Sequence, residues 1–177
     1  ASKQASKQAS KQARLSNAVR WCLLKDVAVM KRGTYVTKKD TRPGNIPVIL
    51  GGQEPAYFCD MSNHEGEAIV ISRSGASAGF VSFWNEPIFV TDGFILEAGQ
   101  EISFKFLYYV LKNMQSHLNR MKRGGGVPHV RSDEIMKIQI PVPPLAEQER
   151  IVSLLDRFDA LTNDMTAGLP AGIDARR

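Results

Sequence analysis

The residues that could perform covalent chemistry in this 177-residue chain are few, and one group has the spacing of an activated serine. The run Gly75–Gly79 has the pattern Gly-x-Ser-x-Gly, and Asp92 and then His117 or His129 follow it in the order serine, acid, histidine. A nucleophile elbow requires a helix directly after the serine, whereas the segment that follows here alternates as a strand does. We therefore expect the glycine-rich run to close a hairpin, and a serine hydrolase using Ser77 stays an alternative.

Two loops combine positive charge with glycine, a combination that suits an anionic ligand. Residues 31–45 carry five Lys or Arg residues against the single acid Asp40, and residues 120–131 carry four, with no acid and three consecutive glycines. Cationic side chains and exposed backbone N–H groups are what contact with a nucleic-acid phosphate requires. We favour phosphate contact for residues 120–131. For residues 31–45 taken alone, a solvated charged loop is the simpler interpretation.

Two polar side chains lie beside glycine-rich turns from which they could reach a base pair. Gln53 follows Gly51-Gly52, and its amide suits an adenine edge. Arg73 precedes the Gly75–Gly79 turn, and its guanidinium suits a phosphate or a guanine edge.

These residues must be positioned by a sheet and a few helices. The apolar runs with strand composition are residues 46–52, 68–71, 80–84 and 87–98, and Asp92-Gly93 is a turn signal that divides the last of them. Residues 104–114 are apolar on nearly every helical turn and predict a buried helix. The first core-facing side chains are expected to be Val19, Trp21, Leu24, Val27 and Val29.

The stretch from Lys137 to Phe158 is the most informative part of the chain. Alternating residues 138–142 predict a half-buried edge strand, which Pro143-Pro144 ends. A helix follows, and its apolar stripe is formed by Ile151, Leu154, Leu155, Phe158, Leu161 and Met165. The stripe must pack either on the chain's own core or on a partner helix, and fewer than three heptads do not establish a coiled coil.

The sequence IPVPPLAEQERIVSLLDRFDALTN in this stretch resembles the end of a target recognition domain in the DNA specificity subunit of type I restriction–modification systems. Looser matches to the family are Trp21 with the residues after it, the Arg73 turn and the glycine-rich segment before the final strand. The resemblance covers nearly all of residues 15–144 and is strongest over 104–163.

The resemblance implies an α+β fold: a mixed, mostly antiparallel sheet with a few helices, then a C-terminal helix that begins a coiled-coil spacer. We divide the chain into a low-complexity segment (1–14), a target recognition domain (15–144) and a truncated helical spacer (145–177). Type I specificity subunits usually pair two recognition domains, so we expect a half-length subunit that must dimerise or a fragment.

On this resemblance the chain is a non-catalytic component that reads one half of a bipartite DNA site. Its expected partners are double-stranded DNA, the methyltransferase and restriction subunits, and a second copy or second half-subunit. S-adenosylmethionine, ATP and Mg would belong to the partner subunits, and we predict no cofactor and no metal in this chain. A structural interaction module that does not bind DNA is the alternative from another class.

The resemblance and the residue types together predict two sets of site residues. The predicted DNA-binding residues are Lys31, Arg32, Lys38, Lys39, Gln53, Arg73, Ser74, Arg120, Lys122, Arg123, Gly124, Gly125, His129 and Arg131. The predicted partner-binding residues are the six of the apolar stripe, Ile151, Leu154, Leu155, Phe158, Leu161 and Met165.

Composition bounds these hypotheses. The content of 43% hydrophobic and 23% charged residues is ordinary for a globular protein. The formal charge of +5 includes three lysines from the Ala-Ser-Lys-Gln repeats of residues 1–12, so the remainder is only mildly basic. Cys22 and Cys59 fit neither a disulfide framework nor a zinc site, and a cytoplasmic location without a membrane span is the expectation.

Overall fold

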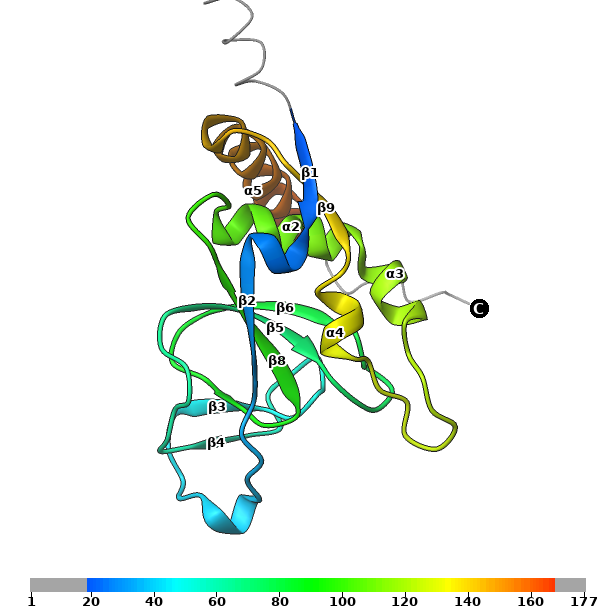
Figure 1. Cartoon of the computed structure of the whole chain (residues 1–177). Coiled ribbons are helices and arrows are strands. Elements are labelled where there is room, and N and C mark those ends of the chain that lie inside the picture. The colour runs from blue at the N-terminus through cyan, green and yellow to red at the C-terminus, as the bar shows by residue number, and fades with distance from the viewer. Residues whose placement is uncertain (1–18, 168–177) are drawn as a thin grey trace, which may run out of the picture.

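The computed structural model describes residues 19–167, with side chains described as far as Thr162. The 1–14 segment therefore lies outside the described residues. The central sheet is antiparallel, with the strand order β2-β8-β5-β6. Its strands are β2 (Ala28–Arg32), β5 (Glu67–Ser72), β6 (Val81–Asn85) and β8 (Gly93–Ala98). Figure 1 shows this sheet at the middle of the molecule.

A second sheet forms the lower lobe, with the order β4-β3-β7. Its strands are β3 (Ile46–Ile49), β4 (Tyr57–Cys59) and β7 (Phe89–Val90), and β3 pairs with β7 in the parallel sense. The apolar run at the start of β5 explains how the two sheets join. Ala68 and Val70 pack with Ile49 and Val90 of the second sheet, while Ile69 and Ile71 face the main core, so both faces of β5 are buried.

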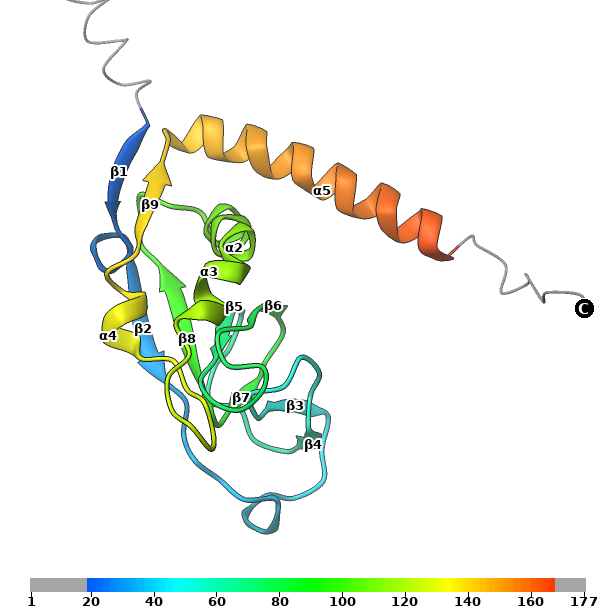
Figure 2. The same cartoon turned by 90° about the vertical axis from the view of Figure 1, so that its right-hand side faces the viewer.

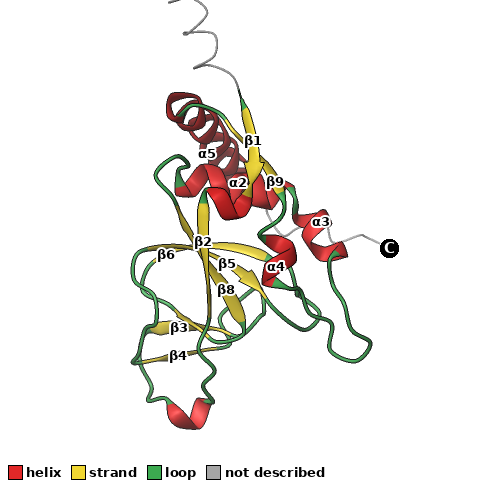
Figure 3. Ribbon diagram, in the orientation of Figure 1, coloured by secondary structure: helices red, strands yellow, loops and turns green. Residues whose placement is uncertain are grey.

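Helices cover the other face of the central sheet, as the ribbon coloured by secondary structure shows (Figure 3). They are α2 (Phe104–Asn113), α3 (Gln115–Arg120) and α4 (Ser132–Ile135), and two short 3₁₀ helices are η1 (Leu24–Asp26) and η2 (Lys38–Asp40). The Ser103 hydroxyl accepts a hydrogen bond from the Phe106 N–H and caps α2. The apolar face of α2 places Phe106, Leu107 and Leu111 in the main core.

A two-stranded sheet pairs β1 (Arg20–Leu23), at the start of the described chain, with β9 (Gln139–Val142), the last strand before α5. Pro143-Pro144 ends β9, and the Pro144 carbonyl accepts the first hydrogen bonds of α5 (Leu145–Ala167). Figure 2 shows α5 passing over α2 and extending beyond the body. Gln148 is fully buried at its start, where the amide accepts from Ser103 N and donates to the carbonyls of Glu101 and Pro143.

The expected phase of the first strand was wrong. Val19, Trp21 and Val29 are 51%, 64% and 57% exposed, whereas Leu24 and Val27 are buried as predicted. Trp21 pairs with Pro141 and the next residue, Cys22, pairs with the buried Ile140, so strand alternation turns Trp21 to the outer face.

The α+β class and the mostly antiparallel sheets are confirmed by this architecture. The strand β2 also extends through Lys31 and Arg32, which the sequence places in a loop. Over the described part of the chain, no helix has both the length and the apolarity needed to cross a bilayer.

Candidate nucleic-acid interface

Four segments that are distant in sequence meet in one backbone ladder at the end of the central sheet. Gly33 N donates to Gly93 O (2.9 Å), Arg73 N to Asp92 O (3.1 Å) and Val130 N to Arg73 O (2.9 Å). Gly75 N also donates to Pro128 O at 2.9 Å. The ladder therefore brings the end of β2, the residues after β5, the start of β8 and the basic 120–131 loop to one place.

This junction carries two hollows that share a wall made by Arg32 and Arg73, and we call them together the central groove. One hollow, of about 390 Å³, is also lined by His129, Arg131 and the apolar Met30 and Phe94. The second, of about 440 Å³, opens toward Tyr35, Leu50 and Asp92. The central groove thus combines cationic walls with an apolar floor.

Asp92 holds two of the predicted residues. Its Oδ1 lies 3.1 Å from Nη1 of Arg73, and its other carboxylate oxygen accepts a hydrogen bond from the Ser74 hydroxyl. The side chains of Arg73 and Asp92 are 32% and 27% exposed, so the ion pair is half-buried but can be reached from the groove. Gly51 has φ of +77° and approaches the Asp92 and Ser74 carbonyls, a backbone position that favours glycine.

The basic 120–131 loop folds back on itself as a narrow hairpin. Arg123 and His129 exchange two backbone hydrogen bonds of 2.9 Å, and Gly124 turns the chain at φ of +105°. Lys122 Nζ donates to the Ala76 carbonyl (2.6 Å), and Arg123 Nε pairs with Glu134 (3.1 Å). Two of the predicted phosphate-binding cations are therefore already in contact with the chain itself.

A separate basic cluster lies on the lower lobe, and it shares no lining residue with the central groove. Lys38 and Arg42 line a hollow of about 430 Å³ with Tyr57 and Phe58. The ammonium of Lys38 is 5.8 Å from the centre of the Tyr57 ring, and Phe58 is 55% exposed. Aromatic rings beside cations are common on protein surfaces that bind nucleic acid. Neither ring was predicted from the sequence to contact DNA.

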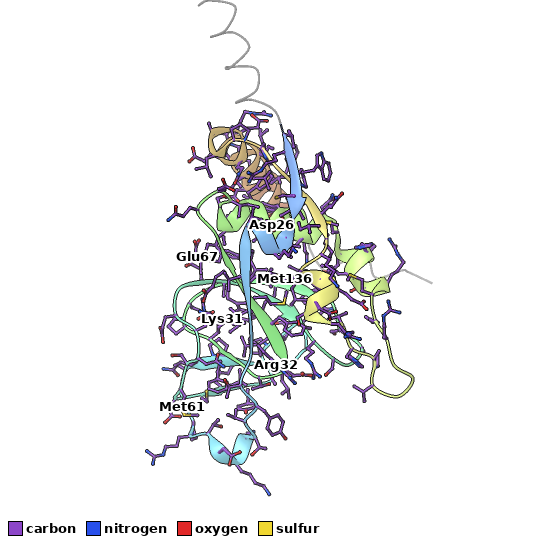
Figure 4. The ribbon with its side chains drawn as sticks, viewed as in Figure 1. Asp26, Lys31, Arg32, Met61, Glu67 and Met136 are labelled. Atoms are coloured by element: carbon purple, nitrogen blue, oxygen red, sulfur yellow. The ribbon has the colours of Figure 1, made fainter. Side chains whose placement is uncertain are left out.

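The structure brings together only some of the predicted DNA-binding residues. Arg32, Arg73, His129 and Arg131 line the central groove, and Ser74 joins them through Asp92. Lys31 and Arg32 are neighbours on β2 (Figure 4), but the Lys31 ammonium pairs with Glu97 at 2.7 Å and Lys31 is not part of the groove lining. The remaining positions, none in the groove lining, are Lys38, Lys39, Gln53, Arg120, Lys122, Arg123, Gly124 and Gly125.

The residues that sequence reasoning missed are the apolar floor and Asp92. In a strand that runs through Arg32, Met30 and Arg32 lie on one side and Lys31 on the other. That alternation is the signal by which Met30 could have been identified. Asp92 was interpreted as a turn residue or a triad acid. No local signal pointed to its contact with Arg73, which lies 19 residues earlier.

A serine triad is not assembled. The Ser77 segment closes the β5–β6 hairpin, as predicted, and Asp92 accepts hydrogen bonds from Arg73 and Ser74 instead of from a histidine. Within residues 19–162, no hydrogen bond joins the Ser77 hydroxyl to His117 or His129. The same described residues contain no group of three or more His, Cys, Asp or Glu side chains that could hold a metal ion.

The predicted partner-binding stripe of α5 divides into two parts. Ile151 and Leu155 face α2 across a hollow of about 580 Å³ that also includes Tyr108 and Tyr109. Leu154, Phe158 and Leu161 are 42%, 63% and 60% exposed. The Met165 side chain lies outside the described residues.

A polar cluster holds the middle of α5 against α2. The Tyr109 hydroxyl donates toward Asp156 (2.6 Å) and Asp159 (2.9 Å), and Lys105 Nζ pairs with Asp156 at 2.8 Å. Burial raises the pKa of Tyr109, and its hydrogen bonds to the two aspartates raise it further. Burial opposes ionisation of Asp156, but hydrogen bonds from Lys105 and Tyr109 outweigh it and lower the pKa of this carboxyl.

Comparison with known proteins gives one family. Residues 22–175 match the model of the type I restriction modification DNA specificity domain. The chain is 40% identical over 80 residues to the EcoR124I/EcoR124II specificity subunit of Escherichia coli, which covers 44% of this chain and 20% of that protein. It is 34% identical over 151 residues to the MjaVIII specificity subunit of Methanocaldococcus jannaschii, with 68% and 35% covered.

Solved structures show the same fold. The crystal structure of a type I restriction–modification S subunit from M. genitalium superposes with a TM-score of 0.74 at 22% identity, covering 85% of this chain and 42% of that one. The HsdS subunit from Thermoanaerobacter tengcongensis gives a TM-score of 0.68 at 20% identity, with 86% and 40% covered. The chain spans less than half the length of each of these relatives. By the match over residues 22–175, it belongs to the type I restriction–modification DNA specificity domain family.

Proposed function

We propose that this chain recognises one half of a bipartite DNA site as part of a type I restriction–modification complex. The observation that carries the proposal is the convergence of Arg32, Arg73, His129 and Arg131 on one groove from three separate segments of the chain. The three arginines attract the phosphate backbone, and an arginine fork can also read a guanine edge.

The cationic and polar residues would have two tasks, phosphate contact and base contact. Exposed cations that lie outside the central groove, such as Lys38 and Lys39, would contact phosphates and add affinity without sequence preference. Base edges in the major groove would be reached by residues at turns, above all Arg73 and also Gln53.

The exposed part of the α5 stripe would dock the other subunits. Leu154, Phe158 and Leu161 present apolar surface on a helix that extends beyond the body, which suits a helix–helix contact. The partners would be methyltransferase and restriction subunits, together with a second copy or second half-subunit. Methyl transfer and cleavage, with their S-adenosylmethionine, ATP and Mg, would belong to those partners, and this chain would be non-catalytic.

Adjacent residues of β2 provide a matched test. We would titrate a fluorescent random-sequence duplex with the full chain at several salt concentrations, comparing Arg32→Ala with Lys31→Ala. Arg32 lines the groove and has no ion pair among the described residues, whereas Lys31 pairs with Glu97. Arg32→Ala should weaken binding and reduce the salt slope by about one counterion, with Lys31→Ala close to the wild type.

If the chain is a structural interaction module, it should not bind duplex DNA in a salt-dependent way. If the wild-type chain shows no salt-dependent affinity for duplex DNA, the DNA-recognition function is wrong. If both variants lose the same affinity, the chain binds DNA but the central groove is not its interface.

A further inference from the structure

Asp92 is an unexpected residue to find in a groove proposed to bind a polyanion. A carboxylate there repels phosphate, which lowers general affinity for DNA. The other acid of the groove, Asp133, lies on α4, pairs with Arg131 at 3.1 Å and is 53% exposed. Asp92 lies instead among the four joined segments, so its place suggests a contribution other than affinity.

The contacts of Asp92 account for both of its carboxylate oxygens. Oδ1 faces Nη1 of Arg73 at 3.1 Å, and Oδ2 accepts the Ser74 hydroxyl hydrogen bond. The Asp92 carbonyl accepts the Arg73 N–H as well, so main chain and side chain of Arg73 are tied to the same residue. Each carboxylate oxygen therefore has a partner within the protein, and Oδ1 is committed to Arg73.

Asp92 itself is held in place from both sides. The preceding Thr91 is 4% exposed and donates its N–H to the Ile49 carbonyl, and the following Gly93 accepts from Gly33 N. The carboxylate is therefore a fixed point, and the guanidinium bonded to it loses much of its rotamer freedom before any ligand arrives. Among the described residues, only Nη1 of the fork has a hydrogen-bond partner, which leaves the other donors of the guanidinium available.

We propose that Asp92 is a positioning residue that aims Arg73, with Ser74 held beside it, at a guanine in the major groove. An arginine whose remaining donors form a planar fork matches O6 and N7 of guanine, and a group that orients it sets which base step it reaches. The inference rests on the proposed DNA-recognition function and adds to it a specificity determinant that does not touch DNA.

The experiment selects bound duplexes from a randomised library with the full chain and sequences them, and it also measures affinity for a random-sequence duplex. The test variant is Asp92→Ala and the matched control is Glu134→Ala. Glu134 is an equally shielded carboxylate, 25% exposed against 27%, that pairs with Arg123 of the basic loop. Each variant removes one negative charge and one arginine partner.

Because both variants lose one negative charge, they should differ from each other in base preference and not in general affinity for DNA. Both should bind the random duplex as tightly as the wild type or more tightly. Only Asp92→Ala should lose the enrichment of guanine at one position, by roughly fivefold or more. Retention of that enrichment in Asp92→Ala, or an equal loss in Glu134→Ala, would overturn the inference.

A second substitution keeps the test decisive if Asp92→Ala unfolds, as its thermal midpoint would reveal. Arg73→Lys retains the charge and removes the fork, so it should lose the same guanine preference. The inference is wrong, and the proposed function is unaffected, if Arg73→Lys keeps the guanine preference or if the wild-type chain binds duplexes without enriching guanine. A wild-type chain that binds no duplex sinks the proposed function and this inference with it.

Discussion

The central groove and the α5 helix are attached to the same body by different kinds of contact. The residues of the groove are located by backbone hydrogen bonds, such as Gly33 to Gly93 and Arg73 to Asp92, within and beside the sheet. The helix α5 is attached by side chains, chiefly Gln148 at its start and Tyr109 with Asp156 at its middle. A backbone ladder gives one geometry, whereas a helix held by a few side chains can be released or redirected without loss of the body.

The largest expected effect is on the groove, from Gly33→Ala. An added Cβ would lie 2.5 Å from the Val90 carbonyl and 2.8 Å from that of Thr91, so the ladder must move. We expect the free energy of unfolding to fall by about 3 kcal/mol, measured by denaturant titration, together with DNA affinity. Gly125→Ala is the control, because an added Cβ there meets no atom within 4 Å. Equal stability of the two variants would show that the ladder is pliable.

A smaller effect is expected from Gln148→Ala at the start of α5. The substitution leaves the part-buried N–H of Ser103 and the carbonyls of Glu101 and Pro143 without Gln148 as their partner. We expect a loss of about 2 kcal/mol. Hydrogen exchange should rise in α5 more than in β5 and β8. Glu149→Ala changes the exposed neighbour on the same helix and should have no such effect. If β5 and β8 exchange as fast as α5, the helix is not a separately released unit.

The smallest effect is a pH dependence at the middle of α5. The pKa of Asp156 is lowered in the folded chain, so its stabilising contribution is present above its unfolded pKa and is lost as pH falls through the folded value. Between neutral pH and roughly pH 3, wild-type α5 should therefore lose hydrogen-exchange protection faster than Tyr109→Phe, which lacks the hydroxyl that bonds Asp156. The Tyr35→Phe control alters an 80% exposed ring and should follow the wild type. Identical pH profiles for Tyr109→Phe and the wild type would contradict the role of this cluster.

The positions of strands and helices could be predicted from the sequence better than which of their side chains face the core. The strand, double proline and helix of residues 137–167 are as expected, because alternation, proline and helical spacing are local signals. The phase of β1 was wrong, because a lone tryptophan between polar and small residues does not show which face meets the core. The α5 stripe was identified correctly as apolar. Its division between α2 and solvent depends on where α2 lies.

The candidate site shows the same division. Charge and glycine content identified the loops that supply Arg32, Arg73, His129 and Arg131, and the resemblance in residues 137–163 indicated the family that the match over residues 22–175 confirms. These signals could not separate Lys31 from its neighbour Arg32, since the pairing of Lys31 with Glu97 and the place of Arg32 in the groove depend on the strands around β2.

By itself, the sequence determined what short-range forces decide: the strand that Pro143-Pro144 ends, the helix of residues 104–113, the turn at Gly75–Gly79 and the start of α5 after Pro144. The tertiary structure alone decided which cations meet, and it converted Asp92 from a turn residue into the partner of Arg73. The physical reason is that hydrogen bonds between Gly33 and Gly93, and between Arg73 and Val130, join residues about 60 positions apart. Such pairings are set by the closure of the whole sheet, and no local pattern of residues encodes them.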